Sequence, residues 1–277
     1  MRPVQVLSYN MSWATQINKV AGSESDFVEA CQLTYKKGGI ACIENAINNI
    51  SQLPELSLIG IQEVNSEIEK KIQEVQPTLL KFERAQINLA IVSILWNPLI
   101  FGNLIKKYSF NLVKDDDRPC LILLLKKDSV PFILINLHMP HRRHHKEAID
   151  RINFELDNDK ELNKFFNMKN VKIIIMGDFN DPQTTIHFNN PLILKSKSNT
   201  IKLKHKKSRK QARQTLKSCC WHKKNHKYKY FSNTGDYILV NKNIKQKYIK
   251  IPSIFKKKGI YNRLASDHMP VLSSLIL

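Results

Sequence analysis

Short runs of apolar residues recur along the chain, and their length and pattern restrict the fold more than any other feature. Runs such as LILLL, FILINL and KIIIM carry apolar side chains at consecutive positions. Strands of this kind are buried on both faces, so each side of their sheet needs a covering layer. We predict strands at Val4–Tyr9, Ser57–Gln62, Leu89–Leu95, Leu121–Lys126, Phe132–Leu137, Val171–Met176, Asp236–Val240 and Val271–Leu277.

Helical patterns lie between these strands. We predict helices at Ser25–Tyr35, Ile40–Ile50, Asn65–Val75 and His144–Met168. Strands and helices mixed in this way predict a layered α/β sandwich. The 277 residues, of which 42% are hydrophobic, can bury a full core in one large domain or two small ones.

Several classes of protein do not fit this sequence. No apolar run approaches the roughly 20 residues of a membrane-spanning helix. The N-terminus, MRPVQVLSYN, lacks the apolar stretch of a signal peptide. The five cysteines show no repeated spacing, which predicts reduced thiols and an intracellular protein. We expect a monomer without stable membrane insertion.

The positive charge of the chain is concentrated in one window. Residues 195–258 hold 21 Lys and Arg residues and a single acid, Asp236. The net charge of this window is therefore +20, which equals the formal net charge of the whole chain. This basic segment predicts affinity for nucleic acid, and its aromatic residues, such as Trp221 and Tyr228, are suited to stacking on bases. The alternative is a solvated basic loop. No element is predicted at 195–230, which reads as a loop insertion.

Polar residues that are costly to bury stand at the ends of the predicted strands. VLSYN ends at Asn10, IGIQ is followed by Glu63, and ILINLH ends at His138. Any one of them has an ordinary explanation as a turn or cap residue. Taken together, these carboxylates, imidazoles and amides indicate a shared crevice at one edge of the sheets. The same position is held by Asp178 and Asn180 after IIIMG, by Asp236 before YILV, and by Asp267 and His268 before the last strand.

Seven motifs resemble, in this order, those of the endonuclease/exonuclease/phosphatase superfamily, which has the deoxyribonuclease-I-like fold. They are LSYN, IQEV, DDRPCLI, NLHMPH, MGDFND, GDYIL and SDHMPV, and they cover nearly the whole chain. The resemblance implies a four-layer α/β sandwich, with two packed mixed β-sheets flanked by helices, in a single domain over residues 1–277. It also implies hydrolysis of phosphate esters with a divalent cation, normally Mg²⁺, with Mn²⁺ as a substitute.

The resemblance assigns roles to the residues at the strand ends. Glu63 is the expected metal ligand, Asn10 ligates or orients the metal site, and Asp267 contributes to it. Asp178 positions or deprotonates water, while His268 acts as base or binds the scissile phosphate. Asp236 would hold the His268 ring in one tautomer, as a carboxylate does in a triad.

Three further residues are expected to bind the substrate phosphate. Asn180 would donate its amide to a phosphate oxygen, and His138 would stabilise the phosphate or protonate the leaving oxygen. Arg118 resembles an arginine that braces the phosphate, although a salt bridge to Asp115–Asp117 explains it equally well. The sequence does not reveal an acidic partner for His138.

Three functions remain open from the sequence. The first is a nuclease or other phosphodiesterase that hydrolyses DNA or RNA. The second is an inositol-polyphosphate phosphatase or sphingomyelinase-like esterase, whose basic segment binds anionic headgroups. The third is a catalytically inactive nucleic-acid-binding module, which the intact acids and histidines argue against.

Overall fold

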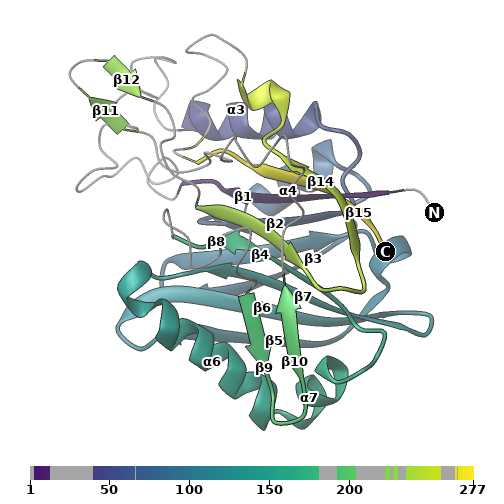
Figure 1. Cartoon of the computed structure of the whole chain (residues 1–277). Helices are drawn as coiled ribbons and strands as arrows, with labels where there is room; N and C mark the ends of the chain where they lie inside the picture. The colour runs from purple at the N-terminus through teal and green to yellow at the C-terminus, as the bar shows by residue number, and fades with distance from the viewer. Residues whose placement is uncertain are drawn as a thin grey trace.

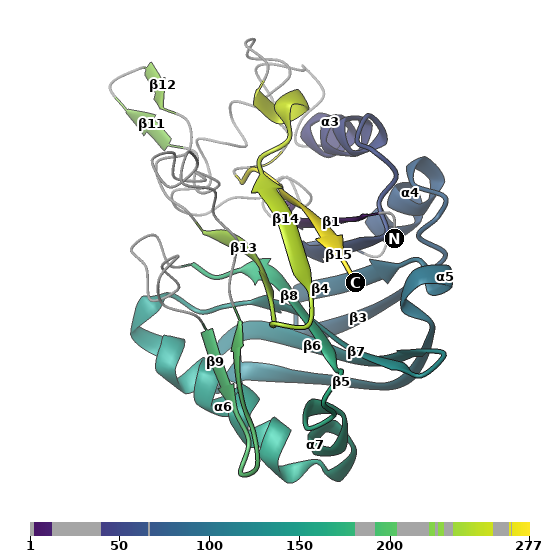
Figure 2. The same ribbon diagram turned by 45° about the vertical axis from the view of Figure 1, so that its right-hand side comes forward.

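The fold consists of two β-sheets packed face to face, with helices over their outer faces (Figure 1). The computed structural model describes residues 3–12, 40–65, 67–180, 192–203, 222–224, 227–229, 235–256, 266 and 268–277. The layers follow the order helix, sheet, sheet, helix (Figure 2). The predicted four-layer α/β sandwich is therefore confirmed.

The six-stranded sheet has the strand order β14-β15-β1-β2-β4-β3. Its strands are β1 (Val4–Asn10), β2 (Leu58–Gln62), β3 (Lys81–Ile87), β4 (Ala90–Trp96), β14 (Lys245–Lys250) and β15 (Val271–Ile276). Because β1 and β2 are parallel, with Asn10 opposite Gln62, their C-terminal ends lie side by side. Helices α3 (Ile40–Ser51) and α4 (Ile68–Val75) cover its outer face, and α5 (Pro98–Phe101) follows β4.

The five-stranded sheet has the order β13-β8-β7-β6-β5. Its strands are β5 (Asn103–Val113), β6 (Asp116–Lys127), β7 (Val130–His138), β8 (Lys172–Asp178) and β13 (Asp236–Val240). Helices α6 (His145–Asn158) and α7 (Lys160–Phe166) lie on its outer face. The remaining elements are the hairpins β9 (Leu192–Lys195)–β10 (Thr200–Leu203) and β11 (His222–Lys224)–β12 (Lys227–Lys229), and the short 3₁₀ helices η1 (Arg142–His144) and η3 (Ser253–Lys256).

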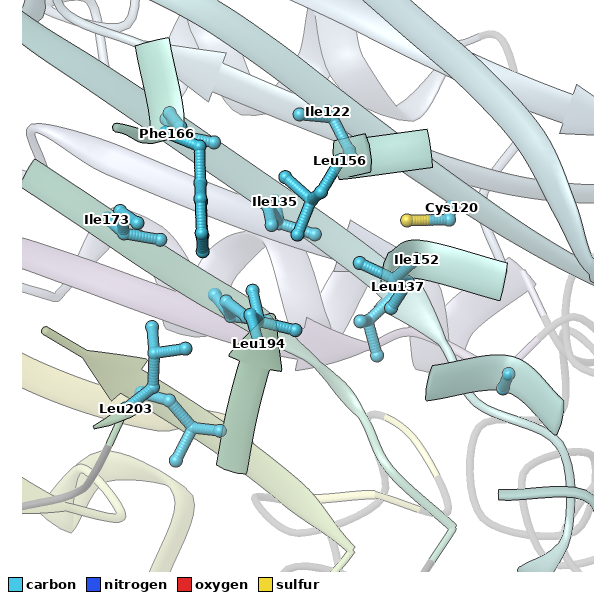
Figure 3. Close-up of a cluster of buried hydrophobic side chains, with 14 of the residues drawn as sticks. Cys120, Ile122, Ile135, Leu137, Ile152, Leu156, Phe166, Ile173, Leu194 and Leu203 are labelled. Carbon is cyan, nitrogen blue, oxygen red and sulfur yellow. The ribbon is translucent and has the colours of Figure 1, made fainter. Parts of the chain in front are cut away.

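Three hydrophobic clusters hold the layers together. One lies between the two sheets, one under α3 and α4, and one under α6 and α7. The cluster under α6 and α7 also receives Leu194 from β9 and Leu203 from β10, and both side chains are fully buried (Figure 3). The β9–β10 hairpin is therefore part of the outer layer of the five-stranded sheet. Consecutive apolar residues in β6, β7 and β8 supply both faces of that sheet, as the sequence predicts.

All eight predicted strands are confirmed, whereas the half-exposed strands were missed. In β5, exposed and partly buried residues alternate, so its apolar signal is weak. The expectation of no element at 195–230 is wrong for residues 200–203, which pair with β9, and for β11 and β12. The predicted helix His144–Met168 is two helices, because Asp159 ends α6 and caps α7. The predicted helix Ser25–Tyr35 lies outside the described residues.

In the described part of the chain, no helix combines the length and apolar character needed to cross a membrane. Cys120 is free and buried in β6. Cys42 in α3 is disulfide-bonded, so the expectation of reduced thiols is wrong for this residue.

The cap at Asp159 gives a prediction about stability at acidic pH. Asp159 Oδ1 accepts the backbone N–H groups of Glu161 and Leu162 at 2.9 and 2.8 Å. Partial burial acts to raise the pKa of Asp159, but hydrogen bonds from the Leu162 N–H, Tyr108 and Lys106 outweigh it and lower the pKa from 3.8 to about 2. A depressed carboxyl pKa stabilises the fold above pH 3.8, and this contribution is lost as pH falls through about 2.

We expect Asp159→Ala to lower the free energy of unfolding by about 1 kcal/mol at pH 7. Asp159→Asn keeps the cap but loses the charge, so its deficit relative to wild type should disappear as pH falls from 5 to 2. Denaturant unfolding across this pH range measures both effects. Asp150→Asn, an exposed carboxylate of α6, is the control. An Asp159→Asn deficit that stays constant with pH would contradict the assignment.

Candidate active site

Three neighbouring strands place three ionisable side chains in one row. In the five-stranded sheet, His138 at the end of β7 is opposite Asp178 at the end of β8, and Asp178 is opposite Asp236 at the start of β13. All three are buried. The row arises because β7 and β8 run parallel while β13 runs antiparallel to them, so two C-terminal ends and one N-terminal end meet at one edge.

The six-stranded sheet contributes Asn10 and Glu63 to the same place. Asn10 Nδ2 donates to Glu63 Oε1 at 2.8 Å and to Asp178 Oδ2 at 3.1 Å, so it bridges the two sheets. Its Oδ1 accepts the Ser12 N–H at 3.0 Å. Of the two predicted roles of Asn10, this geometry favours orienting the carboxylates over ligating a metal.

Three residues around this edge have left-handed backbone conformations. Their φ angles are 58° for Ser12, 55° for Glu63 and 46° for Asn180. Asn tolerates this region well, whereas Glu and Ser rarely adopt it, at a cost of about 1–3 kcal/mol each. Each of the three directly follows or nearly follows a strand end. The conformation turns the chain sharply there and keeps polar side chains close to the edge of the sheets.

His268 faces Asp178 from the loop before β15. Its Nδ1 lies 3.0 Å from Asp236 Oδ2, and its Nε2 lies 3.6 Å from Asp178 Oδ2. Ser266 holds this loop in place, since its Oγ donates to Asn10 O at 2.7 Å and accepts the His268 N–H at 3.1 Å. The Nδ1–Asp236 contact fixes the ring so that Nε2 points toward Asp178.

The surroundings of Asp178 disfavour the charged form of its carboxylate. Burial raises the pKa of Asp178, and the negative charge of Asp236 raises it further, although His268 and His138 act in the opposite direction. Burial lowers the pKa of His138 to about 3, to which the positive charges of Arg118 and His268 contribute, against the pull of Asp178. His138 is therefore neutral at pH 7 in this arrangement.

Arg118 belongs to the cluster and also forms the predicted salt bridge. Its Nε donates to Asp116 Oδ2 at 2.8 Å, and its Nη1 lies 2.7 Å from His138 Nε2. A guanidinium can only donate, so the Nε2 of His138 accepts and the ring proton is on Nδ1. The salt bridge and the phosphate-binding role predicted for Arg118 are thus compatible. Asp116 orients the guanidinium, which still reaches His138 at the edge of the sheets.

The donor atoms match the needs of a hard divalent cation. Glu63, His138 and Asp178 each carry a candidate ligand atom, and these lie within 4.8 Å of one another, as do those of Asp178, Asp236 and His268. The Nε2 of His138 already accepts from Arg118, so the carboxylates are the stronger candidates. Carboxylate oxygens are the ligands that Mg²⁺ prefers, and a cation here would offset the buried negative charge that raises the pKa of Asp178. Glu63, with a side chain 19% exposed, is the most solvent-accessible of these side chains. The residues present therefore fit a metal of this class.

The structure brings together every predicted site residue that it describes. These are Asn10, Glu63, Arg118, His138, Asp178, Asn180, Asp236 and His268. Asn180 joins the others through its N–H, which donates to Asp178 Oδ1 at 2.8 Å, and its amide donates to Met139 O at 2.9 Å. Asp267, predicted for the metal site, lies outside the described residues.

Sequence reasoning missed a pair of buried amides directly behind the site. Gln62 Nε2 donates to Asn136 Oδ1 at 2.6 Å across the two sheets, one residue before Glu63 and two before His138. Asn136 Nδ2 donates in turn to the backbone oxygens of Ile61 and Ser93, both at 2.8 Å. A methyl group on Gly60 would lie 3.1 Å from this amide, so glycine leaves room for it. The signal was present as a polar residue inside the apolar runs FILINL and IGIQ, since such residues need a buried partner.

We expect Asn136→Ala to lower the free energy of unfolding by about 3 kcal/mol, because it removes three hydrogen bonds and leaves Gln62 unpaired between the sheets. Thermal or urea unfolding of the purified variant measures this loss. Asn158→Ala, at an exposed end of α6, is the matched control and should change stability by less than about 0.5 kcal/mol. Equal stability of the two variants would contradict a bridging role for Asn136.

Comparisons with known proteins identify similar structures but no similar sequence. No family model and no curated protein matches the chain. The structure of ANGEL2, a 2′,3′-cyclic phosphatase, is similar with a TM-score of 0.66 and 15% identity, over 99% of this chain and 95% of that one. An endonuclease/exonuclease/phosphatase from Bacteroides vulgatus has a TM-score of 0.60 and 14% identity over 100% of both chains. The human Nocturnin catalytic domain has a TM-score of 0.58 and 13% identity, over 100% and 95%. At sequence identities this low, the structural similarity establishes a shared fold.

Proposed function

We propose that this chain, which has the fold of the endonuclease/exonuclease/phosphatase superfamily, is a divalent-metal-dependent phosphoesterase that hydrolyses phosphodiesters of DNA or RNA. The observation that carries the proposal is the surroundings of Asp178 Oδ2. One carboxylate oxygen lies 3.1 Å from Asn10 Nδ2, 3.6 Å from His268 Nε2 and 3.7 Å from His138 Nε2. Buried acids and imidazoles gathered this tightly are typical of acid–base catalysis rather than of structural packing.

Glu63, held by Asn10, is the proposed ligand of the cation, with Asp178 and Asp267 contributing. A divalent cation, normally Mg²⁺ with Mn²⁺ as a substitute, would there offset the negative charge that grows on the phosphate oxygens. The role of Asn10 is to keep the Glu63 and Asp178 carboxylates at a fixed separation. Asn10 is itself fixed by the Ser12 N–H and, through its backbone oxygen, by Ser266.

Asp178 and His268 handle the proton of the attacking water in this proposal. Asp178, whose pKa is raised, is suited to accept a proton or to orient the water. With the Nδ1–H of His268 donating to Asp236, the lone pair that can accept a proton is on Nε2. The resulting imidazolium is stabilised on both sides, by Asp236 at 3.0 Å and by Asp178 at 3.6 Å.

Arg118, His138 and Asn180 are proposed to bind the phosphate. The guanidinium of Arg118 is anchored by Asp116 and presents its remaining N–H groups at the edge of the sheets. His138, neutral and accepting from Arg118, is better suited to orienting this guanidinium than to protonating the leaving oxygen. One N–H of the Asn180 amide is bonded to Met139 O, and the other can donate to a phosphate oxygen.

Nucleic acid is the proposed substrate because of the charge of the basic segment, residues 195–258. A strand of nucleic acid presents the repeated negative charge that such a segment attracts. Structures with the same fold include a 2′,3′-cyclic phosphatase and a mannosyl-6-phosphatase from Bacteroides thetaiotaomicron, so the fold itself is compatible with several phosphate esters. The charge, rather than the fold, favours a polymer.

A substrate panel tests the proposal. Single- and double-stranded DNA, abasic DNA, RNA, inositol phosphates and sphingomyelin are each incubated with wild type and His268→Ala, with Mg²⁺ or with a chelator. We expect hydrolysis of nucleic acid that is lost with chelator, restored by Mg²⁺, abolished in His268→Ala, and steeply reduced by salt. Full activity on small phosphate esters with none on DNA or RNA would overturn the choice of substrate. No hydrolysis of any ester would favour a binding module.

A further inference from the structure

A cavity lies at the end of the five-stranded sheet opposite the residues around Asp178. It encloses about 800 Å³ between residues 167–171 after α7, residues 198–202 of the β9–β10 hairpin, and residues 241–243 after β13. Asp178 ends β8 and Asp236 begins β13, whereas Val171 precedes β8 and Asn241 follows β13. The two sites are therefore separated by the length of a seven-residue strand, about 20 Å.

The walls of this distal cavity are held by asparagine side chains that donate to backbone oxygens. Asn243 Nδ2 donates to Lys169 O at 3.1 Å and to Val171 O at 2.8 Å. Asn199 Nδ2 donates to Phe166 O at 3.1 Å, which ties the hairpin to the end of α7. With the amide nitrogens used in this way, the amides present their Oδ1 atoms as acceptors. The buried Oδ1 of Asn167 has no hydrogen-bond donor among the described residues.

Positive charge surrounds the same cavity. Lys169, Lys202 and Lys242 line it, and none of the described residues in its lining is acidic. None of these three ammonium groups forms an ion pair with a described residue. Lys202 and Lys242 belong to the basic segment, so part of the positive charge of that segment lies at this cavity. An anionic group is the natural counterpart of three unpaired ammonium groups.

Apolar side chains complete the lining, through Met168, Val171 and Ile201. The cavity thus combines cationic donors, amide acceptors and an apolar surface. Inorganic phosphate would contact only the cationic donors. A fatty acid would contact the cations and the apolar surface but would leave the amide oxygens without donors. A phosphorylated nucleoside supplies all three complements, namely a phosphate, N–H and O–H donors, and the flat face of a base.

We propose that this distal cavity binds a nucleotide, either free or as one unit of a nucleic-acid strand. Lys169, Lys202 and Lys242 contact the phosphate, and the Oδ1 atom of Asn199 accepts from the base or sugar. The base lies on Met168 and Ile201. This site is independent of the phosphoesterase proposal, because it uses none of the residues near Asp178.

Calorimetric titration of the full chain with adenosine 5′-monophosphate, in chelator and at fixed salt, tests the site. We expect Lys242→Glu to weaken binding about tenfold or more, since it removes a charge-assisted contact with phosphate and adds repulsion. Lys70→Glu makes the same charge change on an exposed residue of α4, outside both the cavity and the basic segment, and should leave the affinity within twofold. Lys169→Glu is the second test variant should Lys242→Glu be less stable than wild type in thermal unfolding.

Two further arms separate the sources of the ligand and the two sites. The site is supported, with a strand as its ligand, if a single-stranded oligonucleotide binds while the mononucleotide does not. Lys242→Glu must then weaken binding of the oligonucleotide and Lys70→Glu must not. Equal losses in these two variants, or mononucleotide binding that only Arg118→Ala abolishes, would overturn the proposal. So would a failure of both probes to bind.

Discussion

Asp178→Asn is expected to lower kcat for phosphodiester hydrolysis by about 10³-fold or more while the metal-free protein becomes more stable. The carboxylate accepts from Asn10 and Asn180 and lies beside His138 and His268. Loss of its charge removes the group proposed to take or orient the proton of water. The same charge is buried near Asp236, which raises the pKa of Asp178, so its removal relieves an unfavourable interaction in the folded state.

Steady-state kinetics and thermal unfolding in chelator measure the two effects in one variant. Asp128→Asn is the control, since it makes the same chemical change at a side chain that is 82% exposed in the turn between β6 and β7. It should alter neither quantity. An Asp178→Asn protein with full activity would exclude Asp178 from the chemistry, and one that is much less stable would show that its carboxylate serves the fold.

His268→Ala is expected to lower kcat by about 10²–10⁴-fold, because no other described side chain both contacts Asp236 and faces Asp178. Asp236→Asn should reduce kcat by a comparable factor if Asp236 acts through His268. An asparagine there can donate to Nδ1, which would move the ring proton to Nε2 and leave His268 unable to accept one.

The double variant separates a shared role from two independent ones. If Asp236 acts only through His268, the combination of His268→Ala and Asp236→Asn should lose about as much activity as His268→Ala alone. The pH profile of Asp236→Asn provides a readout that a purely structural role would not change. Its acidic limb, where the proposed base loses its proton, should shift when the carboxylate that faces His268 is replaced. If the loss of kcat in the double variant equals the product of the two single losses, Asp236 and His268 act independently and the proposed pairing is wrong. Asp128→Asn again serves as the control.

Local patterns in the sequence determined most of the architecture. Runs such as KIIIM in β8 are apolar on both faces, and a strand of this kind forms only between two covering layers, so the sandwich followed from the runs themselves. The polar residues at their ends, from Asn10 to His268, were recognisable because burial of such groups beside an apolar strand needs a reason. Strands such as β5 were missed because their half-exposed residues carry little apolar signal.

Only the tertiary structure decided how these residues act on one another. Asn10 and Asp178 are 168 positions apart. No local pattern indicates that the amide of Asn10 donates to two carboxylates, one from each sheet. The pairing of Gln62 with Asn136, the contact of Arg118 with His138, and the distal cavity likewise depend on strand register and on how loops meet. The sequence by itself determined which residues lie at the strand ends, because burial and periodicity are local. Their distances, and the pKa shifts that follow from burial, were decided by the packing of the sheets, because these interactions act across space between segments distant along the chain.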